Sequence, residues 1–205
     1  MHDEKDSTQN IHQHAPLKPH SEMKKAPSFR EDVIRFAFIF LVIIVPFRLF
    51  VAQPFVVSGA SMDPTFHSGD YLIVDQISPK IGSGWQRFDV VVFKFPFQKS
   101  RYLIKRIIGL PGETVVIENG VVSIVNDEFP NGIKLDEPYI THELKDSHTV
   151  TLGEHDYFVM GDNRSGSYDS RQWGPLSEDL LVGEPLVRLF PFNVIDIKPG
   201  HTTSS

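Results

Sequence analysis

The sequence predicts a mainly β protein in which coiled, partly open antiparallel sheets form one domain, preceded by a single N-terminal transmembrane helix. Three observations lead to this prediction. Short β-branched runs alternate with turn signals after residue 54, no long helical pattern appears among them, and one membrane-length apolar stretch precedes them. Because no helices alternate with the strands, parallel βαβ units are not expected. The 205 residues suffice for one such domain and a tail.

The composition excludes several classes of protein and site. The net charge of -6 argues against a nucleic-acid partner, which would normally require a basic patch. The chain has no cysteine, so disulfides, cysteine-type zinc sites and a thiol nucleophile are excluded. No motif indicates a cofactor.

Residues 1–32 are expected to form a disordered cytoplasmic tail. The stretch up to Pro27 is polar, rich in His, Lys, Ser and Pro, and lacks apolar periodicity. His12 and His14 have no further ligands in an ordered frame, so a solvated tail is a better reading than a metal site.

Residues 33–53 are predicted to form the transmembrane helix. The uninterrupted apolar part, Phe36 to Phe47, is about 18 Å long as a helix, whereas 33–53 spans about 31 Å and matches a hydrocarbon core. The longer segment includes Arg35 and Arg48, which lie near its ends and can snorkel to the interface. Pro46 is expected to kink its last turns.

Two alternatives to an anchor are a cleaved signal peptide and a buried globular helix. The long preceding tail and the bulky residues at the exit disfavour the signal peptide. Cations are concentrated before the apolar core, whereas none occurs between Arg48 and Lys80. The positive-inside rule then places the tail in the cytoplasm and everything after Gln53 outside. The cations on the N-terminal side are Lys24, Lys25, Arg30 and Arg35.

Residues 54–198 are predicted to form the β domain, followed by a C-terminal tail over 199–205. Asn119-Gly120 between two alternating runs indicates a hairpin, because both residues tolerate the positive φ of a type I′ turn. Residues 177–181 form at most one helical turn. The expected strands cover 71–74, 90–95, 102–108, 114–118, 121–125, 157–160 and 186–190.

Three segments contain residue types that can take part in catalysis. Ser61 lies in a Ser-Gly-Ala-Ser-Met-Asp-Pro-Thr turn just after the apolar stretch, with small residues before it and Pro64 after it. Taken alone, this is most often an ordinary turn. A reactive serine close to a bilayer, without a histidine motif, indicates chemistry on a substrate presented at the membrane and makes a lysine the natural candidate for the base.

Lys105 lies within an apolar run from Tyr102 to Ile108. Strand alternation places Lys105 and its neighbour Arg106 on opposite faces, so one of the two cations is expected to face an apolar side. A buried lysine loses its proton more readily and can then accept one from a serine. The alternative is a surface lysine that protects an edge strand from aggregation.

The third segment, residues 161–174, is dense in hydrogen-bonding groups and follows an apolar strand. Such a loop can order a site with a hydroxyl that positions an amine and an Asp–Arg pair that holds the loop. A solvated surface loop is the alternative.

Together the segments resemble bacterial type I signal peptidases. The motifs are Ser-Met-x-Pro-Thr from Ser61, Gly69-Asp70, Lys-Arg-x-Ile-Gly-x-Pro-Gly from Lys105, and Gly-Asp-Asn-Arg-x-x-Ser-x-Asp-Ser-Arg-x-Trp-Gly from Gly161. Their order and spacing also agree, and the resemblance covers about residues 47–193.

The resemblance implies a role for each matching residue. Ser61 matches the nucleophile and Lys105 the general base. Ser167 matches a serine that hydrogen-bonds and orients the lysine, and Asp169 and Arg171 match a structural pair that supports the site. Some members of the family place an oxyanion-stabilising serine two residues before the nucleophile. This sequence has Gly59 there, so the oxyanion candidates are the Ser61 N–H and Ser58.

The implied enzyme is a membrane-bound serine endopeptidase that removes signal peptides from exported precursors, with its catalytic domain on the extracytoplasmic side of the cell membrane. It would cut after small residues of the Ala-x-Ala type, through an acyl-enzyme that water resolves. Signal peptides, membrane lipid and the secretion translocon are the implied partners. Two segments would pair with the extended substrate, contributing Phe55, Val57, Tyr102 and Ile104.

Other functions fit the sequence less well. A self-cleaving Ser/Lys repressor peptidase would have a DNA-binding domain in place of the anchor. A specialised leader peptidase serving few substrates is a narrower alternative. A Ser-His-Asp hydrolase would need His67, His142, His148 or His155 as base, and none has a motif around it. A non-enzymatic tethered module or an inactive homologue would not need every catalytic position filled.

Overall fold

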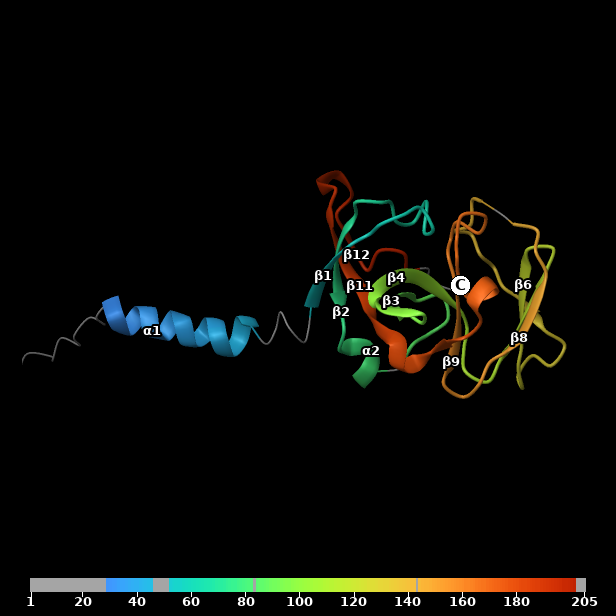
Figure 1. Cartoon of the computed structure of the whole chain (residues 1–205), viewed down its shortest axis with the longest axis horizontal. Helices are drawn as coiled ribbons and strands as arrows, with labels where there is room; N and C mark the ends of the chain where they lie inside the picture. The colour runs from blue at the N-terminus through green and yellow to red at the C-terminus, as the bar shows by residue number, and fades with distance from the viewer. Residues whose placement is uncertain (1–28, 46–51, 83, 143, 202–205) are drawn as a thin grey trace, which may run out of the picture. The chain divides into compact units, whose positions relative to one another are not determined.

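The computed structural model describes residues 29–45, 52–82, 84–142 and 144–201, and its contacts divide the chain into two units, Met1–Phe38 and Ile39–Ser205. Helix α1, Phe29–Ile39, continues as the π-helical turn η1, Phe40–Ile44 (Figure 1). It begins four residues before the predicted anchor, and Glu31 and Asp32 in its first turn favour that start through the helix dipole. In the parts of the chain that the structure describes, no helix has the length and apolarity to cross a membrane.

The prediction of helix up to Gln53 is wrong at its C-terminal end, because Ala52 and Gln53 belong to strand β1 and pair with Asp75 and Val74 of β2. Backbone pairing with a second strand outweighs the apolar character that suggested helix here. Residues 46–51 of the predicted anchor and residues 1–28 of the predicted tail lie outside the described residues.

The larger sheet has eight strands in the order β1-β2-β11-β3-β4-β9-β10, with β12 paired to β11, and all its named pairs are antiparallel. Register shifts in β11, β3 and β4 bend the sheet so that it coils rather than lying flat. Its strands are β1 Ala52–Val56, β2 Tyr71–Asp75, β3 Val90–Phe95, β4 Gln98–Gly109, β9 Asp156–Met160, β10 Leu176–Ser177, β11 Leu181–Phe190 and β12 Asp196–Ile197.

The smaller sheet has four antiparallel strands in the order β7-β6-β5-β8 and lies at the opposite end of the unit from β1 and β2 (Figure 1). The Asn119-Gly120 turn joins β5 and β6 with φ of 51° and 83°, as the sequence predicted. Its strands are β5 Thr114–Glu118, β6 Val121–Val125, β7 Ile133–Lys134 and β8 His148–Thr151.

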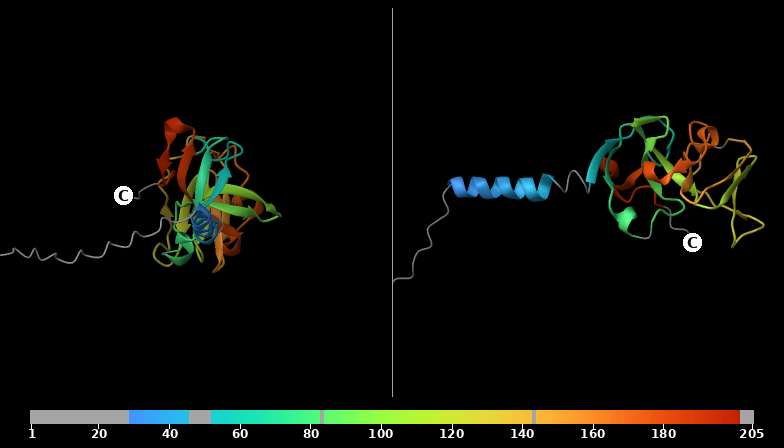
Figure 2. Two further views of the ribbon diagram at one scale, coloured as in Figure 1. Left: turned by 90° about the vertical axis from the view of Figure 1, so that its left-hand side faces the viewer. Right: turned by 60° about the horizontal axis from the view of Figure 1, so that its bottom comes forward.

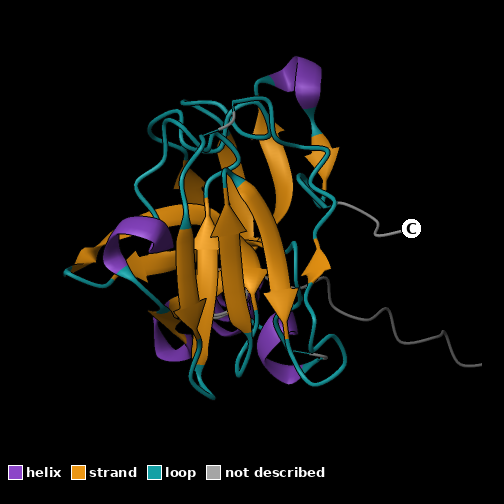
Figure 3. Cartoon of the chain, turned by 90° about the vertical axis from the view of Figure 1, so that its right-hand side faces the viewer, coloured by secondary structure: helices purple, strands orange, loops and turns teal. Residues whose placement is uncertain are grey.

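Helices in this unit are limited to short turns between the strands (Figure 3). Every predicted strand is present, and β4 and β11 extend beyond their predicted bounds. The sequence analysis missed β1, which continues the apolar stretch of the predicted anchor, and it missed β8 and the two-residue strands, which are too short or too polar for a period-two signal. It also missed α2, Ser78–Ile81, and α3, Ser170–Trp173, whereas the helical turn near 177–181 is present as a 3₁₀ turn over Glu178–Leu180.

Strand β4 joins the cores of the two sheets. Ile107 packs into the core of the larger sheet with Phe93 and Val159, while its neighbour Ile108 packs into the core of the smaller sheet with Phe158. This division follows from the alternation of side chains along a strand. A third cluster, which includes Met62, Phe66, Leu72 and Val74, lies under the turn that follows β1. The turn is thereby packed on the sheet.

Gly109 ends β4 where these two cores meet, and a side chain there has no room. A Cβ on Gly109 would collide with the side chain of Val115 and approach Leu152 Cδ1 to 2.8 Å. We expect Gly109→Ala to lower the free energy of unfolding by about 1–3 kcal/mol through overpacking, measured by urea denaturation followed by circular dichroism. Gly153→Ala is the matched control, because its Cβ would meet only the flexible end of Asp156. Equal stability of the two variants would contradict the packing argument.

Candidate active site

Ser61 lies in a tight turn between β1 and β2 that several contacts hold in place. Met62 and Phe66 are buried beneath the turn, and Gly59 supplies a φ of +99° before it. From the segment after β9, the Asn163 backbone N–H donates to the Ser61 carbonyl at 3.1 Å and Asn163 Nδ2 donates to the Ala60 carbonyl at 3.0 Å. The half-buried Ser61 side chain is therefore presented from a backbone held on both sides.

Lys105 lies on β4 beside this turn, and its side chain reaches the serine. Lys105 Nζ donates to Ser61 Oγ at 2.6 Å and to the Ile104 carbonyl at 2.8 Å. The residue is only 2% exposed. Burial lowers the pKa of Lys105 to about 8; the charges of Asp169 and Asp162 oppose this shift and that of Arg101 assists it. About a tenth of the amine is then neutral at pH 7, compared with less than about a thousandth for an ordinary lysine.

Both adjacent cations are buried: Lys105 fits the expectation that one of the two turns away from solvent, and Arg106 is buried in addition. Arg106 Nε and Nη2 donate to the two oxygens of Asp162 at 2.9 and 2.6 Å, so the pair is bidentate. Thr65 Oγ1 donates to the same Asp162 carboxylate at 2.5 Å. The guanidinium also lies over the ring of Tyr139, 4.0 Å from its centroid. A buried charge is tolerated here because its donors are satisfied.

The segment after β9 is an ordered support and not a solvated loop. Asp169 caps α3 through a capping box with Gln172, and its carboxylate accepts from Arg171 Nε at 2.8 Å and Nη2 at 2.9 Å. Burial raises the pKa of Asp169, but the hydrogen bonds and charge of Arg171 outweigh it and hold the pKa below its ordinary value. The Gly161 N–H also donates to Asp169, at 3.0 Å.

Gly161 and Ser167 fill the space behind the serine. A Cβ on Gly161 would collide with the Ser61 carbonyl and the Ser167 hydroxyl, so only glycine fits there. Ser167 is buried, and its Oγ forms no hydrogen bond of normal geometry with a described residue, although its interaction with Asp169 helps to lower the pKa of that carboxyl. The expected hydrogen bond from Ser167 to Lys105 is thus not formed in this structure.

A groove of about 230 Å³ runs from the Ser61–Lys105 pair between two walls, one from residues 55–58 and the other from residues 101–105. Phe55 and Tyr102 meet across it edge to face, with ring centroids 5.2 Å apart. All four candidate substrate-binding residues line the groove, as do Ser58 and Ser61. They are Phe55, Val57, Tyr102 and Ile104.

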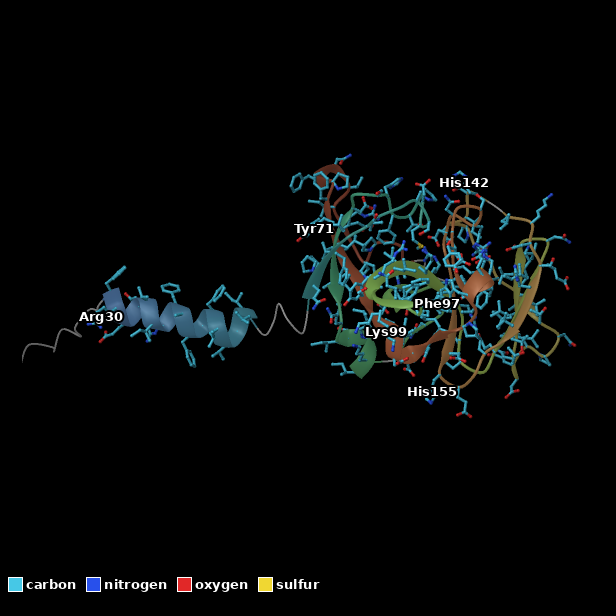
Figure 4. The ribbon with its side chains drawn as sticks, viewed as in Figure 1. Arg30, Tyr71, Phe97, Lys99, His142 and His155 are labelled. Atoms are coloured by element: carbon cyan, nitrogen blue, oxygen red, sulfur yellow. The ribbon has the colours of Figure 1, made fainter. Side chains whose placement is uncertain are left out.

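The histidines do not form a triad with Ser61. His67 Nε2 pairs with Asp63 Oδ1 at 2.9 Å, and His142 approaches the same carboxylate at 3.8 Å. His148 and His155 pair with other carboxylates, and Figure 4 shows His142 and His155 on opposite sides of the unit. Within the described ranges, no hydrogen bond joins a histidine to Ser61, and no group of His, Asp and Glu side chains could hold a metal ion.

The sequence analysis missed three features of the site. Asp162 and Arg106 were within the motifs, but their pairing over 56 positions has no local signal. Asn163, which clamps the Ser61 turn, was missed for the same reason. The buried ion pair between Arg164 and Glu137 also has no local signal in the sequence. A charged residue beside the proposed base on an otherwise apolar strand was the one available hint that a buried partner exists.

Comparisons with known proteins agree on one family. The sequence pattern of the family described as signal peptidase, peptidase S26, matches residues 30–190. Signal peptidase I of Bacillus caldolyticus is 36% identical over 170 residues, covering 76% of this chain and 88% of that protein. Signal peptidase IB of Staphylococcus aureus is 34% identical over 184 residues, covering 80% of this chain and 90% of that protein.

A solved structure is also similar. The crystal structure of a signal peptidase I from Enterococcus faecalis is 32% identical, covers 50% of this chain and 97% of that chain, and superposes with a TM-score of 0.42.

The buried Arg106–Asp162 pair is expected to stabilise the domain because either charge would be left uncompensated without the other. We expect Asp162→Ala to lower the free energy of unfolding by about 3–5 kcal/mol, measured by urea denaturation. Glu178→Ala breaks the exposed His155–Glu178 pair and is the control, with an expected change below about 1 kcal/mol. A change of similar size in both variants would show that burial of the pair is unimportant.

Proposed function

The chain belongs to the signal peptidase family, peptidase S26, and is a serine peptidase that removes signal peptides; we propose that Ser61 is its nucleophile and Lys105 its general base. The observation that carries this proposal is the 2.6 Å contact between Lys105 Nζ and Ser61 Oγ at the end of a groove, with the amine buried. No other ionisable side chain of the described residues forms a hydrogen bond with the Ser61 hydroxyl.

The same contact serves proton transfer when Lys105 is neutral. The Ser61 hydroxyl then donates to the amine lone pair, and as Oγ attacks the scissile carbonyl its proton passes to Nζ. The resulting ammonium protonates the leaving amine of the mature protein, which departs and leaves an acyl-enzyme. Water then gives a proton to the neutral amine and attacks the ester, which releases the signal peptide and restores the Ser61 hydroxyl.

The tetrahedral intermediate needs donors for its oxyanion. The Ser61 backbone N–H is one candidate, because Asn163 Nδ2 donates to the Ala60 carbonyl and so fixes the peptide plane to which this N–H belongs. Ser58 is the second candidate: it is exposed and lines the groove. Gly59 and Ala60 lie between the two residues, and the open space at Gly59 leaves room for a substrate carbonyl.

The groove suits an extended, small-residue substrate. Its walls are strand-like segments that can pair with a third strand between them, and its volume of about 230 Å³ leaves little room for large side chains. This supports cleavage after small residues of the Ala-x-Ala type in exported precursors. The proposed contacts are those of Phe55, Val57, Tyr102 and Ile104.

The remaining parts of the site position the pair. Asp169 and Arg171 hold the segment that contains Gly161 against the Ser61 turn. Ser167 is buried next to Gly161 with a hydroxyl that forms no hydrogen bond of normal geometry to a described residue, which supports a role in receiving a hydrogen bond from Lys105 once the amine is protonated and needs a third acceptor.

The proposal also includes a membrane anchor that starts at residue 33 and ends before β1, which begins at Ala52, with the tail in the cytoplasm and the catalytic unit outside. Support comes from the sequence, which places Phe36 to Phe47 after a cationic stretch, and from the helix over residues 29–45, none of whose residues is buried. Lipid, signal peptides and the secretion translocon would then be its partners. A specialised leader peptidase with few substrates remains the alternative function.

Replacement of either member of the pair tests the assignment. We expect Ser61→Ala and Lys105→Met each to lower kcat by at least about a thousandfold on a precursor with an Ala-x-Ala boundary, because each removes an essential step of acyl transfer. His67→Ala, the control, should retain activity within about twofold. Cleavage is followed by mass spectrometry in detergent, with circular dichroism to verify folding. An inactive His67→Ala with an active Lys105→Met would overturn the assignment.

The pH dependence follows from the lowered pKa of Lys105. Below its pKa of about 8 the amine is protonated and cannot accept a proton, so kcat/KM should fall about tenfold for each pH unit toward acid and level off above pH 8. The rate is measured on a peptide without ionisable groups near the cut, with folding checked at each pH. A flat profile between about pH 6 and 9 would exclude a lysine base of this pKa.

A further inference from the structure

Arg101 is an exposed cation at the end of the groove away from the Ser61–Lys105 pair. It lines the groove, and its guanidinium carbon lies 6.0 Å from the centroid of the Phe95 ring. None of the ion pairs formed between described residues includes Arg101. Its charge is therefore available to a ligand.

The charged side chains that line the groove are all positive. Arg101 and Lys105 are the only lining residues that carry a charged group, and no Asp or Glu lines the groove. The whole β3–β4 hairpin, residues 90–109, likewise contains no acidic residue, although the chain as a whole has a net charge of -6. Figure 2 shows this hairpin, in light green, projecting from the sheet. The far end of the groove thus attracts anions against the general charge of the protein.

The position of Arg101 along β4 relates it to a particular part of the substrate. Arg101 precedes Lys105 by four residues on the same strand, which corresponds to about 13 Å. A substrate strand that lies along this wall, with the residue before the cut beside Lys105, has its residue four positions earlier beside Arg101. Arg101 is exposed, as is its neighbour Tyr102, so this part of the substrate lies close to solvent.

We propose that Arg101 forms an anion subsite that favours substrates with a carboxylate side chain at about the fifth residue before the cut. This inference rests on the proposed function, since it takes the groove as the binding site for the residues that precede the cut. A guanidinium offers two parallel donors to a carboxylate and has no acceptor for a lysine side chain. Because the subsite is partly exposed, its effect is modest and depends on salt.

Three peptides that differ only at this residue test the subsite. They carry Glu, Gln or Lys at the fifth position before an Ala-x-Ala boundary and are cleaved in neutral detergent at low salt. We expect kcat/KM to fall about threefold from Glu to Gln and again from Gln to Lys, and the differences to shrink at 0.5 M salt, where the screening length is roughly 4 Å. Ratios are taken within one enzyme variant, so that any change in Lys105 ionisation cancels.

Variants at Arg101 and at the nearby Lys99 test whether Arg101 causes the preference for a carboxylate. Arg101→Gln should abolish the preference and Arg101→Glu should reverse its order. Lys99→Gln is the matched control, because Lys99 lies on the same hairpin but outside the groove lining, and it should keep the wild-type order (Figure 4). Equal kcat/KM for the three peptides, or a preference that survives in Arg101→Glu, would overturn the proposal.

A lipid role for Arg101 gives a different result. If Arg101→Gln lowers cleavage only on vesicles with anionic lipid, and peptide charge has no effect in neutral detergent, then Arg101 binds lipid headgroups and the subsite proposal is wrong. Normal cleavage of the Gln peptide in that case leaves the proposed function intact. Failure of the wild-type enzyme to cleave any of the three peptides would instead overturn the proposed function and this inference with it.

Discussion

The burial of two adjacent cations on one strand is the constraint on which the site depends. Lys105 and Arg106 are both almost completely excluded from solvent, yet they are compensated differently. Arg106 forms a bidentate pair with Asp162 and cannot lose its proton, so it stays charged and structural. Lys105 is hydrogen-bonded only to a hydroxyl and a carbonyl among the described residues. Burial therefore disfavours its charged form and lowers its pKa to about 8. Because no carboxylate of the described residues is hydrogen-bonded to its amine, Lys105 can act as a base.

The buried ion pair also ties the nucleophile to the rest of the domain. Asp162 accepts from Arg106 on β4 and from Thr65 in the turn that presents Ser61, so one carboxylate joins the strand of the base to the turn of the nucleophile. Its neighbours Gly161 and Asn163 touch the Ser61 turn through close packing and two hydrogen bonds. A short stretch after β9 thus sets the distance between Oγ and Nζ. Preorganisation of this kind keeps the reacting atoms in contact without a substrate.

The sequence predicted those parts of the structure whose signals are local. The β-branched runs, the Asn119-Gly120 turn and the motif residues Ser61 and Lys105 all have characteristic neighbours, and the structure places the predicted strands where expected and the two motif residues in contact. Strand β1 was lost because its residues continue an apolar stretch, and only pairing with β2 distinguishes it from helix. Asp162 and Asn163 were not assigned because their partners lie far away in the sequence. The predicted Ser167–Lys105 hydrogen bond depends on side-chain geometry within a crowded site, which spacing alone does not determine.

The placement of acidic groups near Lys105 explains why a lysine works here at all. Asp169 and Asp162 both act to raise its pKa, and unpaired they would return the amine to its charged form. Each is bonded to an arginine, Asp169 to Arg171 and Asp162 to Arg106, and the positive charge of that arginine acts on the amine in the opposite sense. Loss of either arginine should therefore act on the base as well as on the fold, because it would free a carboxylate to hold the proton on the amine. The two ion pairs therefore affect both the stability of the fold and the pKa of Lys105.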